Sequence, residues 1–155
     1  MYRVGILGCG KIFDRHIEAI IENKDKYKLV ALCDKEESKY RELKKNFKDV
    51  GIFKNYKNML KQKDINFVVI STPNSLHFEH AKFFLENNCD VLVEKPATLN
   101  PDNARKIKEI AVANNQKAYT VLQVRLNKTV RILKSLIDNK KIGKITSVVL
   151  AQRWQ

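Results

Sequence analysis

The sequence predicts an α/β fold in which helices cover both faces of a doubly wound parallel sheet. Short runs rich in valine and isoleucine alternate with longer amphipathic stretches, which is typical of repeated βα units. The runs are almost continuously apolar, as expected for parallel strands buried on both faces. With 155 residues, 44% of them hydrophobic, the chain is long enough for one domain with a sizeable core.

Six segments are the expected strands, of which the third is short and weak. In chain order they are residues 2–8 (YRVGILG), 28–34 (KLVALCD), 51–53 (GIF), 66–72 (NFVVIST), 90–96 (DVLVEKP) and 118–124 (AYTVLQV). Between them, residues 11–22 and 37–47 carry apolar side chains at helical spacing and are expected to pack on the sheet. Another helix is expected from Pro101, because Asn100 can cap it and Asp102 suits its first turn.

The end of the chain is predicted to form one more helix and the beginning of a strand. Asn127 can cap a helix that carries Val130, Leu133 and Ile137 on one face, and Gly143 would terminate it. A strand-like run then starts at Ile145.

The charge of the chain raises the hypothesis of a nucleic-acid-binding protein. There are 30 lysine and arginine residues against 17 acidic ones, a formal net charge of +13. However, acidic residues are interleaved within the lysine-rich stretches, and aromatic residues do not alternate with the lysines as a stacking platform requires. We therefore interpret the lysines as solvated helix faces and expect no nucleic-acid partner.

The cysteines and the N-terminus indicate the compartment. Cys9, Cys33 and Cys89 are odd in number and lack metal-ligand spacing, so neither a disulfide framework nor a metal site is expected. A strand pattern begins at Tyr2, and no apolar run approaches the roughly 18 residues that a membrane span needs. The sequence therefore predicts a cytoplasmic protein without a membrane partner.

A glycine-rich turn follows the first strand. The segment GILGCGKIF places Gly8 and Gly10 at the turn, with Lys11 and Ile12 opening the next helix, where a pyrophosphate can approach backbone amides. The third small residue of the dinucleotide-binding pattern is replaced by Phe13, which implies a different contact between helix and sheet.

An acidic residue ends the second strand. Asp34 lies 24 residues after Gly10, close to the spacing of about 20 at which a carboxylate holds the adenosine ribose of NAD. The adjacent Lys35 can meet a 2′-phosphate, so NADP is the alternative cofactor. A role for Asp34 as a turn residue alone also stays open.

Three motifs in the order GCGKI, VVISTPNSLHFEHA and VLVEKP resemble the Gfo/Idh/MocA family of oxidoreductases over essentially the whole chain. The resemblance implies a Rossmann NAD(P)-binding fold with strand order 3-2-1-4-5-6, followed by a second α/β domain. We therefore expect residues 1–122 to be the NAD(P)-binding domain. Residues 123–155 would be a connecting helix and the first strand of a truncated substrate domain. The resemblance also implies a homo-oligomer at full length.

The loop after the fourth strand is expected to face the cofactor, because ligands bind beyond the carboxyl ends of strands near the switch in strand order. By resemblance, the residues that line the dinucleotide there are Ser71, Thr72, Pro73, Asn74 and His77. The alternatives are a helix cap for Asn74 or Ser75 and a polar surface role for His77. His16, on the apolar stripe of the first helix, is interpreted as a hydrogen-bonded packing residue.

The tripeptide Glu94-Lys95-Pro96 ends the fifth strand. The resemblance implies that Lys95 is catalytic, contacting both cofactor and substrate beside C4 of the nicotinamide, and that the Lys95–Pro96 peptide is cis. Hydride leaves a carbinol carbon easily only if its hydroxyl loses a proton, and an ammonium stabilises the developing alkoxide. Glu94 can orient Lys95 or bind a ribose hydroxyl. The alternative is that Lys95 is an ordinary surface lysine.

The Gln-x-Arg pattern at Gln123 and Arg125 resembles the subgroup that oxidises UDP-N-acetylglucosaminuronate at C3 in lipopolysaccharide biosynthesis. Gln123 would then contact the cofactor and Arg125 a carboxylate or phosphate of the substrate, with pairing to the second domain as the alternative for Arg125. The sequence thus predicts an NAD-dependent dehydrogenase domain acting on a CH–OH group of a sugar or nucleotide sugar. The alternative is a nucleotide-binding sensor or module without catalysis.

Overall fold

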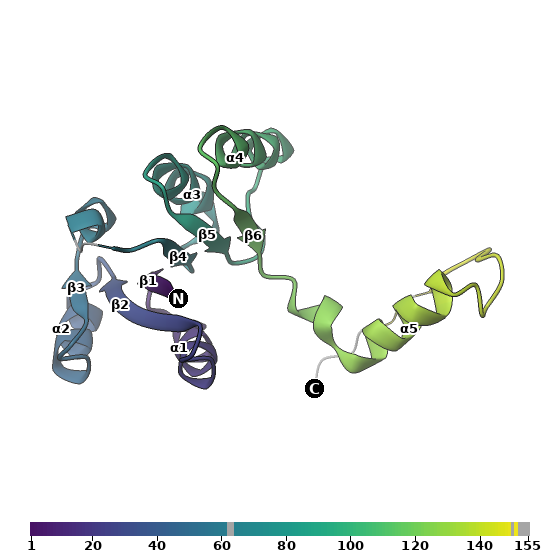
Figure 1. The fold of residues 1–155 in the computed structure, drawn as a ribbon, viewed down its shortest axis with the longest axis horizontal. Helices are drawn as coiled ribbons and strands as arrows, with labels where there is room; N and C mark the ends of the chain where they lie inside the picture. The colour runs from purple at the N-terminus through teal and green to yellow at the C-terminus, as the bar shows by residue number, and fades with distance from the viewer. Residues whose placement is uncertain (62–63, 150, 152–155) are drawn as a thin grey trace. The chain divides into compact units, whose positions relative to one another are not determined.

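A computed structural model describes residues 1–61, 64–149 and 151 and contains a parallel sheet of six strands. The strands are β1 (Tyr2–Leu7), β2 (Tyr27–Cys33), β3 (Gly51–Phe53), β4 (Phe67–Ile70), β5 (Asp90–Val93) and β6 (Ala118–Thr120). Their order in the sheet is β3-β2-β1-β4-β5-β6, which confirms the Rossmann topology implied by the sequence (Figure 1). The predicted short third strand is present as β3.

Helices cover both faces of this sheet (Figure 1). On one face lie α1 (Phe13–Glu22) and α2 (Glu37–Asn46), and on the other α3 (His77–Glu86) and α4 (Pro101–Ala113). Phe13, the large residue in the glycine motif, is buried and meets the ring of Phe47 edge to face at 6.0 Å. Phe13 also belongs to the cluster that contains Ile6 and Leu32 of the sheet, so a large ring stands at the contact between helix and sheet where the dinucleotide-binding pattern has a small residue.

Two helices have predicted N-caps, and only one of these caps is formed by its side chain. The side chain of Asn100 accepts a hydrogen bond from the amide of Asp102 at 2.8 Å and caps α4, as predicted. Asn127 occupies the N-cap of α5 (Lys128–Asp138) but makes no side-chain cap bond, and α5 ends before Gly143. The described residues also contain the 3-10 turns η1 (Tyr56–Lys61), η2 (Asn74–Leu76) and η3 (Gln123–Leu126).

The chain separates into two compact units, Met1–Val121 and Leu122–Gln155. In the second unit the expected strand from Ile145 is not formed over residues 145–149, while residue 150 and residues 152–155 lie outside the described part. A strand needs a neighbouring strand to pair its backbone amides and carbonyls, and the described part of this unit contains none. The apolar face of α5, with Ile132, Leu133, Leu136 and Ile137, is exposed.

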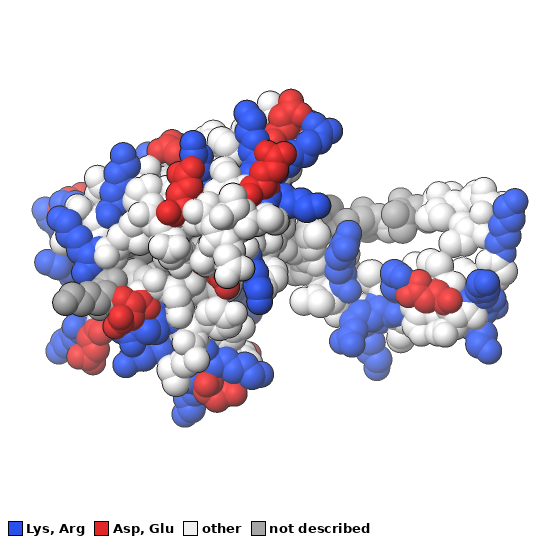
Figure 2. Space-filling model, turned by 45° about the horizontal axis from the view of Figure 1, so that its top comes forward, with Lys and Arg blue, Asp and Glu red and all other residues white. Residues whose placement is uncertain are grey.

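Charged side chains of both signs alternate over the surface shown in Figure 2. Several pair along one helix at three- or four-residue spacing: Arg15 with Glu18 at 3.1 Å, Lys39 with Glu42 at 2.9 Å and Lys82 with Glu86 at 3.8 Å. Such pairs are typical of solvated helix faces. Within the described residues, no helix combines the length and the apolar character needed to cross a membrane.

The ends of β1 and β4 approach each other closely at the switch in strand order. Gly8 has φ +91°, and a Cβ there would lie 2.6 Å from the carbonyl oxygen of Ser71. The hydroxyl of Ser71 donates to the Gly8 carbonyl at 2.7 Å and closes the junction. A Cβ at Gly10 would meet no atom within 4 Å, so that turn is open to a ligand.

The two glycines are therefore expected to respond differently to alanine. Gly8→Ala should lower the free energy of unfolding by about 2 kcal/mol or more. The alanine would have to adopt a left-handed backbone conformation, and its Cβ would clash with the backbone of Ser71. Gly10→Ala is the matched control and should leave stability within about 0.5 kcal/mol. Urea denaturation measures both, and equal losses would contradict this account of the junction.

Candidate functional site

A pocket of about 400 Å³ opens at the carboxyl ends of the strands, at the switch point between β1 and β4. In a doubly wound sheet this is where ligands bind. Its lining combines predicted and unpredicted residues: Leu7, Gly8, Gly10, Cys33, Asp34, Lys35, Glu36, Lys54, Tyr56, Ser71, Thr72, Pro73, Leu76 and His80. The glycine turn, the acidic end of β2 and the loop after β4 are thus brought together around one cavity.

Asp34 is both a turn residue and a wall of this pocket. One carboxylate oxygen accepts the amide of Cys9 at 2.8 Å, and the other accepts the amide of Glu36 at 2.9 Å. Each carboxylate oxygen has a second lone pair, so the carboxylate can still accept bonds from ribose hydroxyls. The two alternatives weighed for Asp34 are therefore combined in one side chain, and the exposed Lys35 stands beside it.

The loop after β4 only partly follows the expectation. Ser71, Thr72 and Pro73 line the pocket, whereas Asn74 is exposed on η2 and neither η2 nor α3 has a side-chain N-cap bond. From the sequence, His77 is expected either to line the dinucleotide or to lie on the surface. Instead its exposed fraction is 0%, and it is not among the residues that line the pocket. Its helix turns the ring inward, beneath the loop.

The glycine turn supplies Gly8 and Gly10 to the pocket, but Lys11 and Ile12 are exposed beside it and do not line it. Helix α1 begins at Phe13, two residues after the expected start at Lys11. Both side chains therefore lie outside the cavity formed by the chain itself.

Sequence reasoning missed several residues of this pocket, chiefly Lys54, Tyr56 and His80. Lys54 follows β3, so the rule that ligands bind beyond strand ends was a signal for it. The ring of Tyr56 meets His80 at 4.5 Å, and the hydroxyl of Thr72 lies 3.0 Å from His80 Nδ1. Burial lowers the pKa of His80, with smaller contributions from its charged neighbours. No local pattern indicated this contact between η1 and α3.

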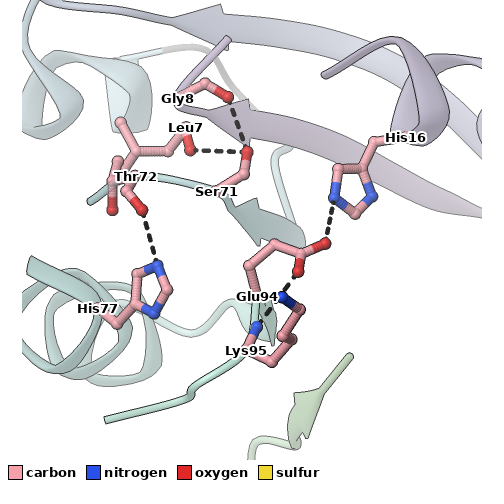
Figure 3. A network of polar contacts seen from close by, with 8 residues as sticks. All are labelled: Leu7, Gly8, His16, Ser71, Thr72, His77, Glu94 and Lys95. Carbon is pink, nitrogen blue, oxygen red and sulfur yellow. Dashed lines mark hydrogen bonds and ion pairs between the residues drawn. The ribbon is translucent and has the colours of Figure 1, made fainter. Parts of the chain in front are cut away.

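The Glu94-Lys95-Pro96 segment follows β5, and Figure 3 shows the polar contacts of Glu94 and Lys95. The Lys95–Pro96 peptide is cis, as predicted, and Lys95 is exposed. The Glu94 carboxylate lies 3.0 Å from Nε2 of His16 and also accepts the backbone amide of Lys95 at 3.2 Å. His16 is a hydrogen-bonded histidine, as interpreted from the sequence, and its partner is Glu94.

The remaining predicted site residues, Gln123 and Arg125, lie in η3 of the second unit. Both side chains are exposed. Within the described residues, neither has a side-chain hydrogen bond or an ion pair that fixes its direction.

The three cysteines are free and buried. Burial raises the pKa of the Cys9 and Cys33 thiols to about 12 and that of Cys89 to about 11. These thiols are therefore protonated and packed, and they do not provide nucleophiles. In the described ranges, no cluster of three His, Cys, Asp or Glu residues is arranged to hold a metal ion.

Comparison with known proteins agrees with the fold. Residues 2–122 match the profile described as "Oxidoreductase family, NAD-binding Rossmann fold". The chain belongs to the Gfo/Idh/MocA oxidoreductase family. D-glucoside 3-dehydrogenase of Escherichia coli is 29% identical over 70% of this chain and 31% of its own length. Glucose-6-phosphate 3-dehydrogenase of Bacillus subtilis is 30% identical over 96% of this chain and 41% of its own.

Solved structures of the family superpose well on this chain. WlbA dehydrogenase from Bordetella pertussis, in complex with NADH and UDP-GlcNAcA, has a TM-score of 0.87 at 26% identity and covers 92% of this chain. Scyllo-inositol dehydrogenase from Lactobacillus casei, with NAD(H) and scyllo-inositol, has a TM-score of 0.84 at 25% identity and covers 94%. The chain spans 41% and 43% of these two proteins.

The position of Asp34 predicts that the chain binds NAD more tightly than NADP. Asp34→Ala should weaken NAD binding by about 1 to 3 kcal/mol, because ribose hydroxyls lose a charged acceptor, and it should erode the preference over NADP. Calorimetry with both dinucleotides measures this. Lys35→Ala is the control and should weaken NADP only. Equal or tighter binding of NADP by the unmodified chain would mean that Lys35 dominates the pocket.

The lowered pKa of His80 predicts a loss of stability in acid. A pKa depressed by folding means that the neutral ring stabilises the fold above the unfolded value of 6.5, and that this contribution is lost as pH falls below it. The melting temperature should therefore drop between pH 7.5 and pH 5. His80→Asn, which keeps a polar group for Thr72 but cannot titrate, should drop less. An equal drop in both proteins would show that other groups account for the pH dependence.

Proposed function

We propose that this chain is the cofactor domain of an NAD-dependent oxidoreductase that transfers hydride between nicotinamide and a secondary alcohol of a sugar or nucleotide sugar. The observation that carries the proposal is the exposed Lys95 at the carboxyl end of β5, in a domain of the NAD-binding oxidoreductase family. Binding a dinucleotide alone does not require a lysine at this strand end, whereas in alcohol oxidation an ammonium beside the reacting oxygen stabilises the developing alkoxide.

The residues present fit NAD. The open turn at Gly10 leaves room for a pyrophosphate near backbone amides, and Asp34 offers free lone pairs to ribose hydroxyls. When bound, NAD supplies a hydride acceptor. The chain's own contribution is to hold the dinucleotide and to present the Lys95 ammonium to the substrate oxygen, where it stabilises negative charge as the hydroxyl proton leaves.

A nucleotide sugar is the finer proposal. WlbA dehydrogenase was solved with UDP-GlcNAcA, and Gln123 and Arg125 of this chain resemble the pattern of the subgroup that oxidises this substrate. The planar fork of Arg125 suits the carboxylate or phosphate of such a ligand. Relatives that act on D-glucosides, glucose 6-phosphate and inositols define the panel of competing substrates.

The proposal predicts that the activity appears when a substrate domain is supplied. A chimaera in which this chain replaces the matching segment of the Bordetella WlbA dehydrogenase should reduce NAD with UDP-GlcNAcA. Lys95→Met in the chimaera should lower kcat by roughly 10² to 10³. The isolated chain should bind NAD without turnover, because substrate positioning is worth about 7 to 11 kcal/mol of barrier. Absorbance of reduced nicotinamide measures all three.

Two outcomes would contradict this proposal. A chimaera that binds NAD but reduces it with no substrate of the panel would favour a nucleotide-binding module without catalysis. An isolated chain that matches the rate of the chimaera would show that the substrate site and proton acceptor lie within these 155 residues.

A further inference from the structure

The ammonium of Lys95 is not held by a contact of its own. Lys95 is exposed, and among the described residues its Nζ has no hydrogen bond or ion pair. A lysine side chain is a point charge on a flexible four-carbon stem. Catalytic groups must be held within about 0.5 Å of their productive geometry. Control over Lys95 in this chain must therefore come from the backbone on either side of it.

On the N-terminal side, Glu94 is held by α1. His16 Nε2 lies 3.0 Å from Oε1 of Glu94, and the two side chains are only 12% and 13% exposed. The other oxygen, Oε2, accepts the backbone amide of Lys95 at 3.2 Å. Because an ionised carboxylate only accepts, His16 must donate from Nε2. One carboxylate thus connects α1 to the amide of Lys95.

On the C-terminal side, Pro96 is held by α3. His77 Nδ1 lies 2.7 Å from the carbonyl oxygen of Pro96, and Nε2 lies 2.8 Å from that of Thr72. Carbonyl oxygens only accept, so both contacts are hydrogen bonds only when both ring nitrogens carry a proton. A neutral ring donates from one nitrogen only, so one of these two contacts is a hydrogen bond, and the shorter one, from Nδ1 to Pro96, is the one that the clamp requires.

The two histidines reach this segment from opposite faces of the sheet. His16 belongs to α1 on one face and His77 to the first turn of α3 on the other (Figures 1 and 3). The other ring nitrogen of His77, Nε2, lies 2.8 Å from the carbonyl oxygen of Thr72, a residue that lines the pocket. The backbone before and after Lys95 is therefore fixed to two helices, one of which begins next to the glycine turn.

We propose that His16 and His77 are positioning residues that clamp Glu94 and Pro96 and thereby fix the direction in which the Lys95 ammonium is presented. This inference rests on the proposed function, in which that ammonium meets the substrate. It differs from a packing role, in which loss of either ring would weaken the fold but leave the surroundings of Lys95 unchanged.

The clamp is tested by observing Lys95 directly in this chain. Lysines are converted to ¹³C-dimethyl-lysine, and the Lys95 resonance is assigned by its disappearance in Lys95→Arg. We expect NAD to shift this resonance in the unmodified chain. In His16→Leu, which removes the donor, the shift should fall to less than half. In His16→Gln, whose amide can donate to Glu94, it should recover, with NAD affinity within about threefold throughout.

Ile20→Ala provides the matched control, because it weakens the packing of the same helix without touching Glu94. It should lower stability while leaving the Lys95 shift as in the unmodified chain. If His16→Leu and Ile20→Ala gave the same Lys95 response, His16 would be a packing residue and the proposal would be overturned.

The arm formed by His77 is tested without a substitution, since replacing a buried ring can unfold the domain. We expect ¹⁵N-edited NMR of the unmodified chain to show a proton on Nδ1 of His77, the nitrogen that faces the carbonyl of Pro96. A ring proton on Nε2 alone would mean that the contact with Pro96 is not a hydrogen bond, and the clamp would fail on that side. Neither measurement needs turnover, so an inactive chimaera would defeat the proposed function while leaving the clamp to be decided on its own.

Discussion

The cofactor end of the domain depends on how closely the ends of β1 and β4 approach each other. Only hydrogen fits in place of a side chain at Gly8, because the carbonyl of Ser71 occupies the position of a Cβ. The Ser71 hydroxyl donates to the carbonyl of Gly8, and the Ser71 backbone amide donates to the carbonyl of Leu7, so the junction is fixed twice. The glycine turn and the loop that carries Thr72 and Pro73 thereby become two walls of one pocket.

Asp34, at the end of β2, forms a third wall of the pocket and also holds the backbone around it. Its carboxylate organises two backbone amides, one in the glycine turn and one in its own turn, and still faces the pocket. Exchange of Asp34 therefore removes two contacts that hold the loop as well as a carboxylate that lines the pocket. For this reason stability and affinity have to be measured separately whenever Asp34 is altered.

The histidines of this chain connect helices to loops and strand ends. His77 and His80 are the buried polar residues of the described part, and both contact Thr72. His16 lies on the other face and contacts Glu94. A neutral imidazole can donate from one nitrogen and accept at the other, and a protonated one donates from both. The side chain is therefore suited to connect loops whose available groups are carbonyls, hydroxyls and carboxylates.

The sequence by itself determined the features that depend on neighbouring residues. Apolar runs located the strands of the sheet, Asn100 and Pro101 located the start of α4, and the glycine turn and Asp34 were recognised as the ends of β1 and β2 that line a pocket, because each depends on local backbone geometry. Tertiary structure decided what depends on distant partners. His16 and Glu94 are 78 positions apart, Tyr56 reaches His80 across two elements, and His77 turned inward although its motif indicated the pocket. The strand expected at Ile145 is absent from residues 145–149 for the same physical reason, since apolar periodicity is local but a strand forms only against another strand.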